Sequence, residues 1–365
     1  MNKNEIQWFY PSFDENEKKK LLELVDTNYL NEGKVTLRFE RLLADYLGVK
    51  YAVATTSGTA AITLALLSLN IGYGDEVIVP NFTFIATANA VSFCGASVKF
   101  VDINENDFLI NTEILEKSIS QKTKAVIAVD VNGRGCDYKN LEKICKRKKL
   151  SLICDSAEAI GSKYKDKFLG TFGDVGCFSF SAAKTLSTGQ GGLVVTNRKN
   201  LYYRLLELKD QGRRYRGTGG NDKHPSIGFN FKYTDLQATI GIEQFKKLKK
   251  RIKLFHERDK NYFNNLKNIN EIQIPPKKEG EVLQWFDIIV KKNKRALLKF
   301  MKKNHIGYRE FWEPLNSQKA YKHFDQIYYN TSYVSKAGLW LPSNFDLCKK
   351  TIDFISKKLV DFYAT

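Results

Sequence analysis

From about residue 50 onward, short apolar segments typical of β-strands alternate with segments typical of α-helices. The first strand, "YAVATT" (51–56), is followed by a helix over 58–69 and by a second strand, "DEVIVP" (75–80). The same order continues with helices over 84–94 and 138–149 and with strands over 97–103, 123–131 and 150–155. Such repetition predicts an α/β fold in which a mainly parallel sheet is covered by helices on both faces.

A second unit follows the sheet region. One long helical pattern covers 234–266, and the proline pair in "IPPKKEGE" (274–281) marks a break after it. Beyond the break, 282–292 has the pattern of a strand and 294–305 that of a helix, which predicts a small α+β domain. We therefore expect an N-terminal segment and large domain over residues 1–245, and a linking helix and small C-terminal domain over 246–365.

The chain is strongly basic. Its 365 residues include 58 Lys and Arg against 40 Asp and Glu, a net charge of +18. Such a charge suits nucleic acid, an acidic membrane surface or small anionic substrates. The basic runs, such as 146–149 and 246–251, lie within amphipathic helical patterns and favour solvated helix faces. Because no zinc-finger spacing or RNP-like motif accompanies them, we expect no nucleic-acid partner.

Cysteine usage and apolar runs indicate where the protein works. The six cysteines are scattered without a CxxC pair, which favours a reduced, cytoplasmic protein. The N-terminus lacks the apolar core of a signal peptide, and no run approaches the ~18 apolar residues of a membrane span, so we expect no membrane insertion. The four histidines form no ligand spacing, and no metal site is expected.

Lys184 stands among small residues in "SFSAAKTLSTGQGG" (179–192), between two apolar strand patterns. Burying an unpaired ammonium is costly, and desolvation makes an amine a nucleophile that can form a Schiff base. The alternative is an ordinary loop lysine over the sheet edge. This peptide alone does not decide between the two interpretations.

Two further features lie where strands of the sheet end. "TSGTAA" (56–61) follows a strand and opens a helix, so its free amides and the Thr59 hydroxyl can bind a phosphate; the alternative is a plain Ser/Thr helix cap. Asp155 ends the strand over 150–155 and is either a helix cap or a partner for a cation. Since ligands bind at the carboxyl ends of such strands, both features and Asp130 are expected near Lys184.

Together these signals describe one ligand. A phosphate site, a carboxylate at a strand end and a buried lysine are what pyridoxal 5'-phosphate requires. The carboxylate would keep the pyridine nitrogen protonated, and the lysine would bind the cofactor covalently and then move protons. Phe84 could cover the ring, or it could be a core residue.

At these residues the chain resembles the DegT/StrS family of pyridoxal-phosphate-dependent nucleotide-sugar aminotransferases. The resemblance covers nearly the whole length and runs through "SGTAAITLAL", "GDEVIVPNFTFIATANAV", "DSAEAIGSKYKDKFLGTFGDVGCFSF", "AAKTLSTGQGG", "GFNFKYTDLQATIG" and "REFWEPL". It implies the fold type I of the aspartate aminotransferases and a homodimer with active sites at the subunit interface.

The resemblance also implies roles for single residues. Lys184 would bind the cofactor covalently, Asp155 would face the pyridine nitrogen, and Glu158 would approach the phenolic oxygen. Asn230 would reach the phosphate of the neighbouring subunit's cofactor. The remaining cofactor contacts implied by motif position, around the phosphate and the ring, are Ser57, Gly58, Thr59, Ala60, Phe84, Ala157 and Ser179.

The implied reaction moves an amino group, with glutamate as the expected donor, to a nucleotide-linked keto-deoxy sugar. Glu158 in its motif is similar to the perosamine-forming members, which aminate GDP-linked 4-keto-6-deoxymannose for surface polysaccharides. A UDP- or dTDP-linked ketosugar and a non-catalytic cofactor-binding regulator are alternatives. Lys184 itself favours the aminotransferases over related sugar dehydratases, in which histidine replaces it. Candidates for the substrate site are Arg213, Arg214, Arg216, Arg309 and Trp312, each of which could instead be a surface or packing residue.

Overall fold

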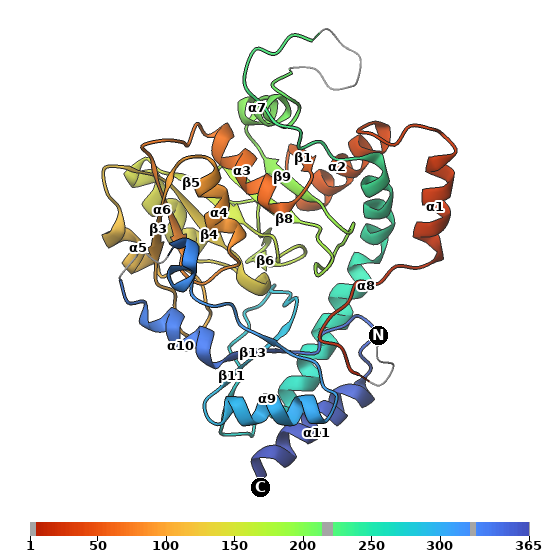
Figure 1. The fold of residues 1–365 in the computed structure, drawn as a ribbon, viewed down its shortest axis with the longest axis vertical. Helices are drawn as coiled ribbons and strands as arrows, with labels where there is room; N and C mark the ends of the chain where they lie inside the picture. The colour runs from red at the N-terminus through yellow and green to blue at the C-terminus, as the bar shows by residue number, and fades with distance from the viewer. Residues whose placement is uncertain (1–4, 214–221, 322–325, 365) are drawn as a thin grey trace.

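The computed structural model describes residues 5–213, 222–321 and 326–364. A seven-stranded sheet in the order β1-β9-β8-β5-β4-β2-β3 forms its larger part (Figure 1). Within it, β9 alone runs antiparallel to its neighbours, and the other strands share one direction. The strands of this sheet are β1 (Tyr51–Thr55), β2 (Glu76–Pro80), β3 (Ser97–Val101), β4 (Thr123–Val129), β5 (Ser151–Asp155), β8 (Val175–Ser179) and β9 (Gly192–Thr196). The predicted α/β class with a mainly parallel sheet is confirmed.

Side chains of β1 show why helices cover both faces of the sheet. Successive residues of a strand point to opposite faces, and Ala52 and Ala54 pack with Phe39 of α2, whereas Val53 packs with Leu205 of α7. The helices of this part are α1 (Glu15–Val25), α2 (Lys34–Leu47), α3 (Gly58–Ser68), α4 (Ala86–Phe93), α5 (Thr112–Ser118), α6 (Tyr138–Lys148) and α7 (Lys199–Lys209). At β1 the apolar alternation therefore places neighbouring side chains in two separate apolar clusters.

A second, antiparallel sheet in the order β10-β11-β13-β12 forms the smaller part. Its core contains Ile288 of β11, Leu297 of α9, Leu359 of α11 and Leu266 at the end of α8. The elements of this part are β10 (Ile272–Gln273), β11 (Phe286–Val290), α9 (Lys294–Lys303), β12 (Arg309–Glu310), α10 (Tyr329–Ala337), β13 (Gly338–Leu341) and α11 (Lys349–Ala364). The strand predicted over 282–292 is shorter than expected, because 282–285 form a connection to the larger part.

The long helix α8 (Asp235–Leu266) runs beside both sheets (Figure 1). Thr234 caps it by accepting from the amide of Gln237, whose side chain in turn accepts from the amide of Thr234, which is a capping box. The predicted helix over 234–266 is thus confirmed. The predicted division at residue 245 falls inside α8, and it stays a prediction. No helix in the described parts of the chain has the length and apolar character needed to cross a membrane.

Asp130 directly follows β4, and Asp155 is the last residue of β5. The amide of Asp130 donates to the carbonyl of Asp155 over 3.0 Å, so the carboxyl ends of the two strands are joined. The Asp130 carboxylate is fully buried and accepts hydrogen bonds from Tyr138 Oη and Ser156 Oγ. Burial raises the pKa of Asp130 to about 7 despite these donors.

This raised pKa predicts a pH-dependent contribution to stability. Between about pH 4 and 7 the folded chain keeps the proton of Asp130 and the unfolded chain releases it, so the free energy of unfolding falls as pH rises. Since one pKa unit corresponds to about 1.4 kcal/mol, the loss from this group is at most about 4 kcal/mol. The variant Asp130→Asn should lack this part of the slope in urea unfolding at pH 4 to 7. Asp166→Asn, in the exposed turn between β6 (Lys163–Tyr164) and β7 (Lys167–Phe168), should keep it; equal slopes in all three proteins would contradict the assignment.

Candidate active site

A cavity of about 370 Å³ lies at the carboxyl edge of the large sheet. Its lining comes from both parts of the chain, because Asp155 and Lys184 of the large part face Trp285 and Arg309 of the small part. Parallel strands that end at one edge bring together side chains that are far apart in the sequence. The cavity therefore gathers the chemistry that the sequence predicted for this edge.

Lys184 lies in the connection between β8 and β9, with a side chain that is 13% exposed. Its Nζ donates to Glu158 Oε1 over 3.0 Å and lies 5.6 Å from the centre of the Trp285 ring. Lys184 is thus a loop residue, as one interpretation holds, and its side chain is largely buried, as the other requires. Glu158 compensates the burial of the ammonium by accepting from it. The role of this amine in Schiff-base formation stays a prediction.

Glu158 is held by its second carboxylate oxygen. Oε2 accepts from the backbone amide of Asn132 over 2.9 Å, and Asn132 adopts a left-handed backbone with φ of 55°. The Asn132 side chain in turn accepts from the amide of Trp285 and donates to Asp287 of β11. The orientation of the carboxylate beside Lys184 therefore depends on contacts with the small part of the chain.

Asp155 is 4% exposed and has two hydrogen-bond donors. Thr87 Oγ1 donates to its Oδ2 over 2.7 Å, and the amide of Ala157 donates to its Oδ1 over 3.3 Å. No helix follows Asp155, so the helix-cap interpretation is wrong. Burial raises the pKa of Asp155, and a bound cation or protonated ring nitrogen would stabilise its charged form.

The first turn of α3 approaches β8 closely. A Cβ on Gly58 would lie 2.8 Å from Ser179 Cβ, so only glycine fits here without a shift of Ser179. Ser57, Gly58, Thr59 and Ser179 all line the cavity. The amides of a first helical turn have no backbone partner within the helix, so such a turn can bind an anion.

Ser57 also caps α3, because its Oγ accepts from the amide of Ala60 over 3.1 Å. The helix-cap alternative for this motif is therefore correct as well. The same bond engages the Ala60 amide, and Ala60 does not line the cavity. The expectation that Ala60 holds a phosphate is thus not supported by the geometry.

Phe84 is 52% exposed and lines the cavity together with Ala157 and Trp312. Its ring centre lies 6.4 Å from that of Trp312. The alternative of a core phenylalanine is wrong at this position.

Other predicted residues do not reach this cavity within the chain. Asn230 is exposed and pairs with Asp210 in an isolated β-bridge. Arg213 donates to Asp210 over 2.7 Å instead of facing the cavity. Arg214 and Arg216 lie outside the described residues.

Sequence reasoning missed Thr87, Asn132 and Trp285. Thr87 lies within a helical pattern, and Trp285 lies within the apolar run "VLQWFD", so neither carries a local signal of a site. Asn132 follows Asp130 closely, and its left-handed backbone is a feature that asparagine tolerates better than most residues. Only that residue preference could have drawn attention to it.

The donor set fits pyridoxal 5'-phosphate. A helix turn that can bind an anion, a buried carboxylate with no ion pair to a described residue and a primary amine surround one cavity, and an exposed phenylalanine at this cavity can cover a ring. These are the groups that such a cofactor needs for its phosphate, its ring nitrogen and its aldehyde.

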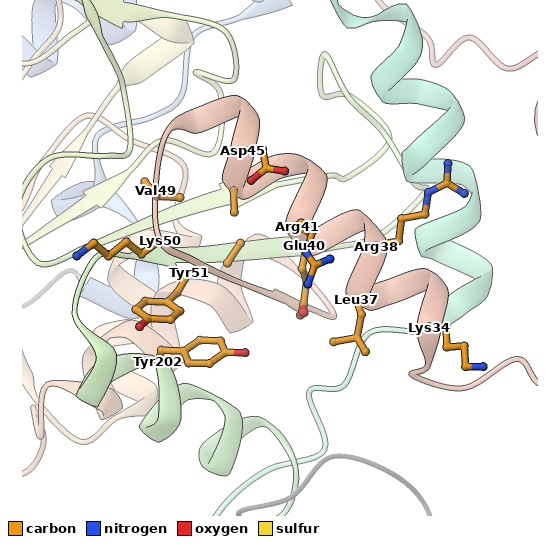
Figure 2. Close-up of a pocket in the computed structure, with 12 residues that line it drawn as sticks. Lys34, Leu37, Arg38, Glu40, Arg41, Asp45, Val49, Lys50, Tyr51 and Tyr202 are labelled. Carbon is orange, nitrogen blue, oxygen red and sulfur yellow. The ribbon is translucent and has the colours of Figure 1, made fainter.

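A larger recess of about 590 Å³ lies elsewhere, along α2 and β1 (Figure 2). Figure 2 shows the rings of Tyr51 and Tyr202 side by side at one end and Lys34 at the other. None of the predicted site residues that the structure describes lines this recess, so its size does not make it the active site. In the described segments, no group of three or more His, Cys, Asp or Glu side chains is arranged to hold a metal ion.

Comparisons with known proteins agree with this geometry. A model of the DegT/DnrJ/EryC1/StrS aminotransferase family matches residues 11–360. The GDP-perosamine synthase of Vibrio cholerae is 34% identical over 367 residues, which cover 98% of this chain and 99% of that protein.

Two solved structures extend the comparison to the fold. The Helicobacter pylori aminotransferase PseC, involved in the biosynthesis of pseudoaminic acid, is 27% identical with a TM-score of 0.93 over 99% of both chains. The Escherichia coli GDP-4-keto-6-deoxy-D-mannose-3-dehydratase, solved with bound hydrated pyridoxal phosphate, is 26% identical with a TM-score of 0.88. That likeness covers 97% of this chain and 100% of the dehydratase.

The fold type I that the motifs predicted is confirmed by these structures. The family match spans almost the whole chain, including the seven-stranded and the four-stranded sheet. The chain therefore belongs to the DegT/DnrJ/EryC1/StrS aminotransferase family.

Proposed function

We propose that this chain is a pyridoxal-phosphate-dependent aminotransferase that transfers the amino group of glutamate to GDP-linked 4-keto-6-deoxymannose, forming GDP-perosamine for surface polysaccharides. The observation that carries the proposal is the meeting of Lys184, Asp155 and the first turn of α3 in one cavity. Similarity over 98% of the chain to a GDP-perosamine synthase supports the choice of sugar.

Each group around the cavity has a task in this reaction. When bound, the cofactor supplies an electron-accepting ring that acidifies the α-carbon proton of the amino donor. Lys184 binds the cofactor covalently, and after release its amine carries that proton from the α-carbon of the donor. Because Glu158 accepts from Lys184 Nζ, it orients the amine and stabilises the ammonium form while the proton is held.

Asp155 would hold the proton on the ring nitrogen of the bound cofactor. Its burial makes an isolated negative charge unfavourable, and a protonated ring nitrogen compensates that cost. Ser57, Gly58, Thr59 and Ser179 would hold the phosphate through amides and hydroxyls.

The same groups would serve a UDP- or dTDP-linked ketosugar, which is the second candidate substrate. A non-catalytic regulator on this fold is less consistent with a lysine and a glutamate joined at 3.0 Å inside the cavity. Incubation of the enzyme with glutamate and a panel of GDP-, UDP- and dTDP-linked ketosugars tests these candidates. Amination of the GDP sugar is expected, and failure of every sugar would contradict the proposed function.

We also propose a homodimer that shares its active sites and works in the cytoplasm. The side chain of Asn230 is exposed, and that of Ile227 is 84% exposed. The segment before Tyr233 can therefore contact a second subunit. The six cysteines are free, as a reducing compartment would require.

Replacement of Lys184 should abolish amino transfer. The variant Lys184→Ala removes the amine that moves the proton, and general acid–base transfer contributes about 10²–10⁴-fold. We expect kcat for GDP-sugar amination to fall by at least this factor while the circular dichroism spectrum is retained. Lys146→Ala, on the exposed face of α6, is the matched control and should keep full activity. A Lys184→Ala enzyme as active as that control would refute the role.

Replacement of Asp155 should affect the ring nitrogen alone. The variant Asp155→Asn keeps the shape of the side chain but removes its charge, and loss of one such electrostatic contact costs about 10²–10³-fold in kcat. A cofactor analogue methylated on the ring nitrogen carries a permanent positive charge and should restore part of the activity. If the analogue fails to improve the variant relative to ordinary cofactor, Asp155 acts in another way.

Mixing two inactive variants tests the shared site. In a dimer of Lys184→Ala with Asn230→Ala, one of the two sites combines an intact Lys184 with an intact Asn230 from the other subunit. Random re-association of equal amounts, after mild denaturation and refolding, should recover about a quarter of wild-type activity. No recovery above the separately refolded variants would argue against a contribution of Asn230 across the interface.

A further inference from the structure

All four tryptophans of the chain gather beside the cavity. Trp8, Trp285, Trp312 and Trp340 form a continuous cluster with ring centres 5.0–5.1 Å apart. They come from the N-terminal segment, the connection before β11, the segment after β12, and β13. Trp285 and Trp312 line the cavity itself.

Three of these indoles have a buried N–H group without an acceptor. The Nε1 atoms of Trp8, Trp285 and Trp312 make no hydrogen bond with any residue that the structure describes, whereas that of Trp340 donates to Asp287 over 2.8 Å. Trp285 is only 1% exposed, so its N–H group cannot be satisfied by bulk water. Buried donors without acceptors are uncommon in folded proteins and call for an explanation at each position.

Arg309 brings further unused donors to the same wall. Its guanidinium carbon lies 5.0 Å from the Trp8 ring, 5.9 Å from Trp285 and 5.7 Å from Trp340. Across the described parts of the chain, this guanidinium makes neither a hydrogen bond nor an ion pair. The packed rings fix its position, and the charge of Glu158 partly opposes the lowering of the Arg309 pKa by burial.

The charged residues that line the cavity indicate a role for Arg309. Among the described residues that line the cavity, two are cations, Lys184 and Arg309, and Lys184 is already paired with Glu158. Arg309 is therefore the cation that remains for an anionic group of a substrate. A guanidinium presents a planar fork of donors, which matches the two oxygens of a carboxylate.

We propose that Arg309, on the tryptophan wall formed by Trp285 and Trp312, binds the α-carboxylate of the amino donor. This inference rests on the proposed aminotransferase function and specifies where its first substrate is recognised. The α-carboxylate is bonded to the same carbon as the amino group that is transferred, so its binding group must lie near Lys184. Arg309 meets this condition, since both cations contact the Trp285 ring.

The diphosphate of the sugar nucleotide fits this position less well. In a 4-keto sugar the diphosphate is attached to carbon 1, across the sugar ring from the carbon that is aminated. A diphosphate also carries more than one negative charge, whereas this wall offers a single cation. The structure therefore assigns Arg309 to the donor instead of the nucleotide.

A binding experiment on the cofactor-loaded enzyme tests the assignment. Glutarate has the carboxylates of glutamate but no amino group, so it binds without reacting, and the loaded cofactor already fills the phosphate site. All four tryptophans lie in the cluster, so glutarate should produce a saturable change in tryptophan fluorescence. Arg309→Met should raise the Kd of glutarate about tenfold or more, because a charge-assisted pair is lost.

Three comparisons make the result specific. Arg309→Lys should raise the Kd less than Arg309→Met, because it keeps the charge without the fork. Arg295→Met, an exposed arginine on α9, should leave the Kd unchanged. The Kd of GDP should be the same in the wild type and in Arg309→Met, and in the amination assay this variant should raise the KM for glutamate but not for the sugar.

Two results would overturn the inference. The first is unchanged glutarate binding in Arg309→Met, and the second is weakened binding of GDP in place of glutarate. Both leave the aminotransferase function intact, since that function is judged by amination of ketosugars. Conversely, failure of every ketosugar would refute the function while the glutarate titration still reports on Arg309.

Discussion

The ion pair between Lys184 and Glu158 is the contact on which the rest of the site depends. Each group would be costly to bury alone, so their 3.0 Å contact makes both stable at the sheet edge. Glu158 is oriented by the Asn132 amide, and Asn132 is joined by its side chain to Trp285 and Asp287. The position of the reactive amine is thus set by both sheets of the molecule together, and chemistry at Lys184 requires that they stay packed.

The fold was largely predictable, because alternating strand and helix patterns leave few arrangements for a parallel sheet. The ends of those strands also predicted where Asp155 and the turn at Gly58 would lie. The partner of Lys184 was not predictable from spacing, since Glu158 reaches it through two loops whose geometry depends on the small sheet. The same limit applies to Ala60. Its amide could donate either to the Ser57 side chain or to a bound phosphate, and only the structure shows that it donates to Ser57.

The tryptophan cluster shows what sequence patterns cannot reveal. Residues 8, 285, 312 and 340 share no motif, and each lies in a segment where an apolar side chain is expected. Their packing around Arg309 joins the N-terminal segment to the small sheet and gives one wall of the cavity its unused donors. The predicted cofactor contacts therefore lie on the large part, and the tryptophan wall comes from the N-terminal segment and the small part.

The most direct test of this account is to locate the covalent bond between the cofactor and the protein. Borohydride reduction of the enzyme loaded with pyridoxal phosphate makes that bond permanent. Proteolysis and mass spectrometry then identify the lysine that carries it. The account predicts the cofactor mass on the peptide that contains Lys184, and on no other lysine in comparable yield. Labelling at a different lysine, or no label at all, would contradict the central claim.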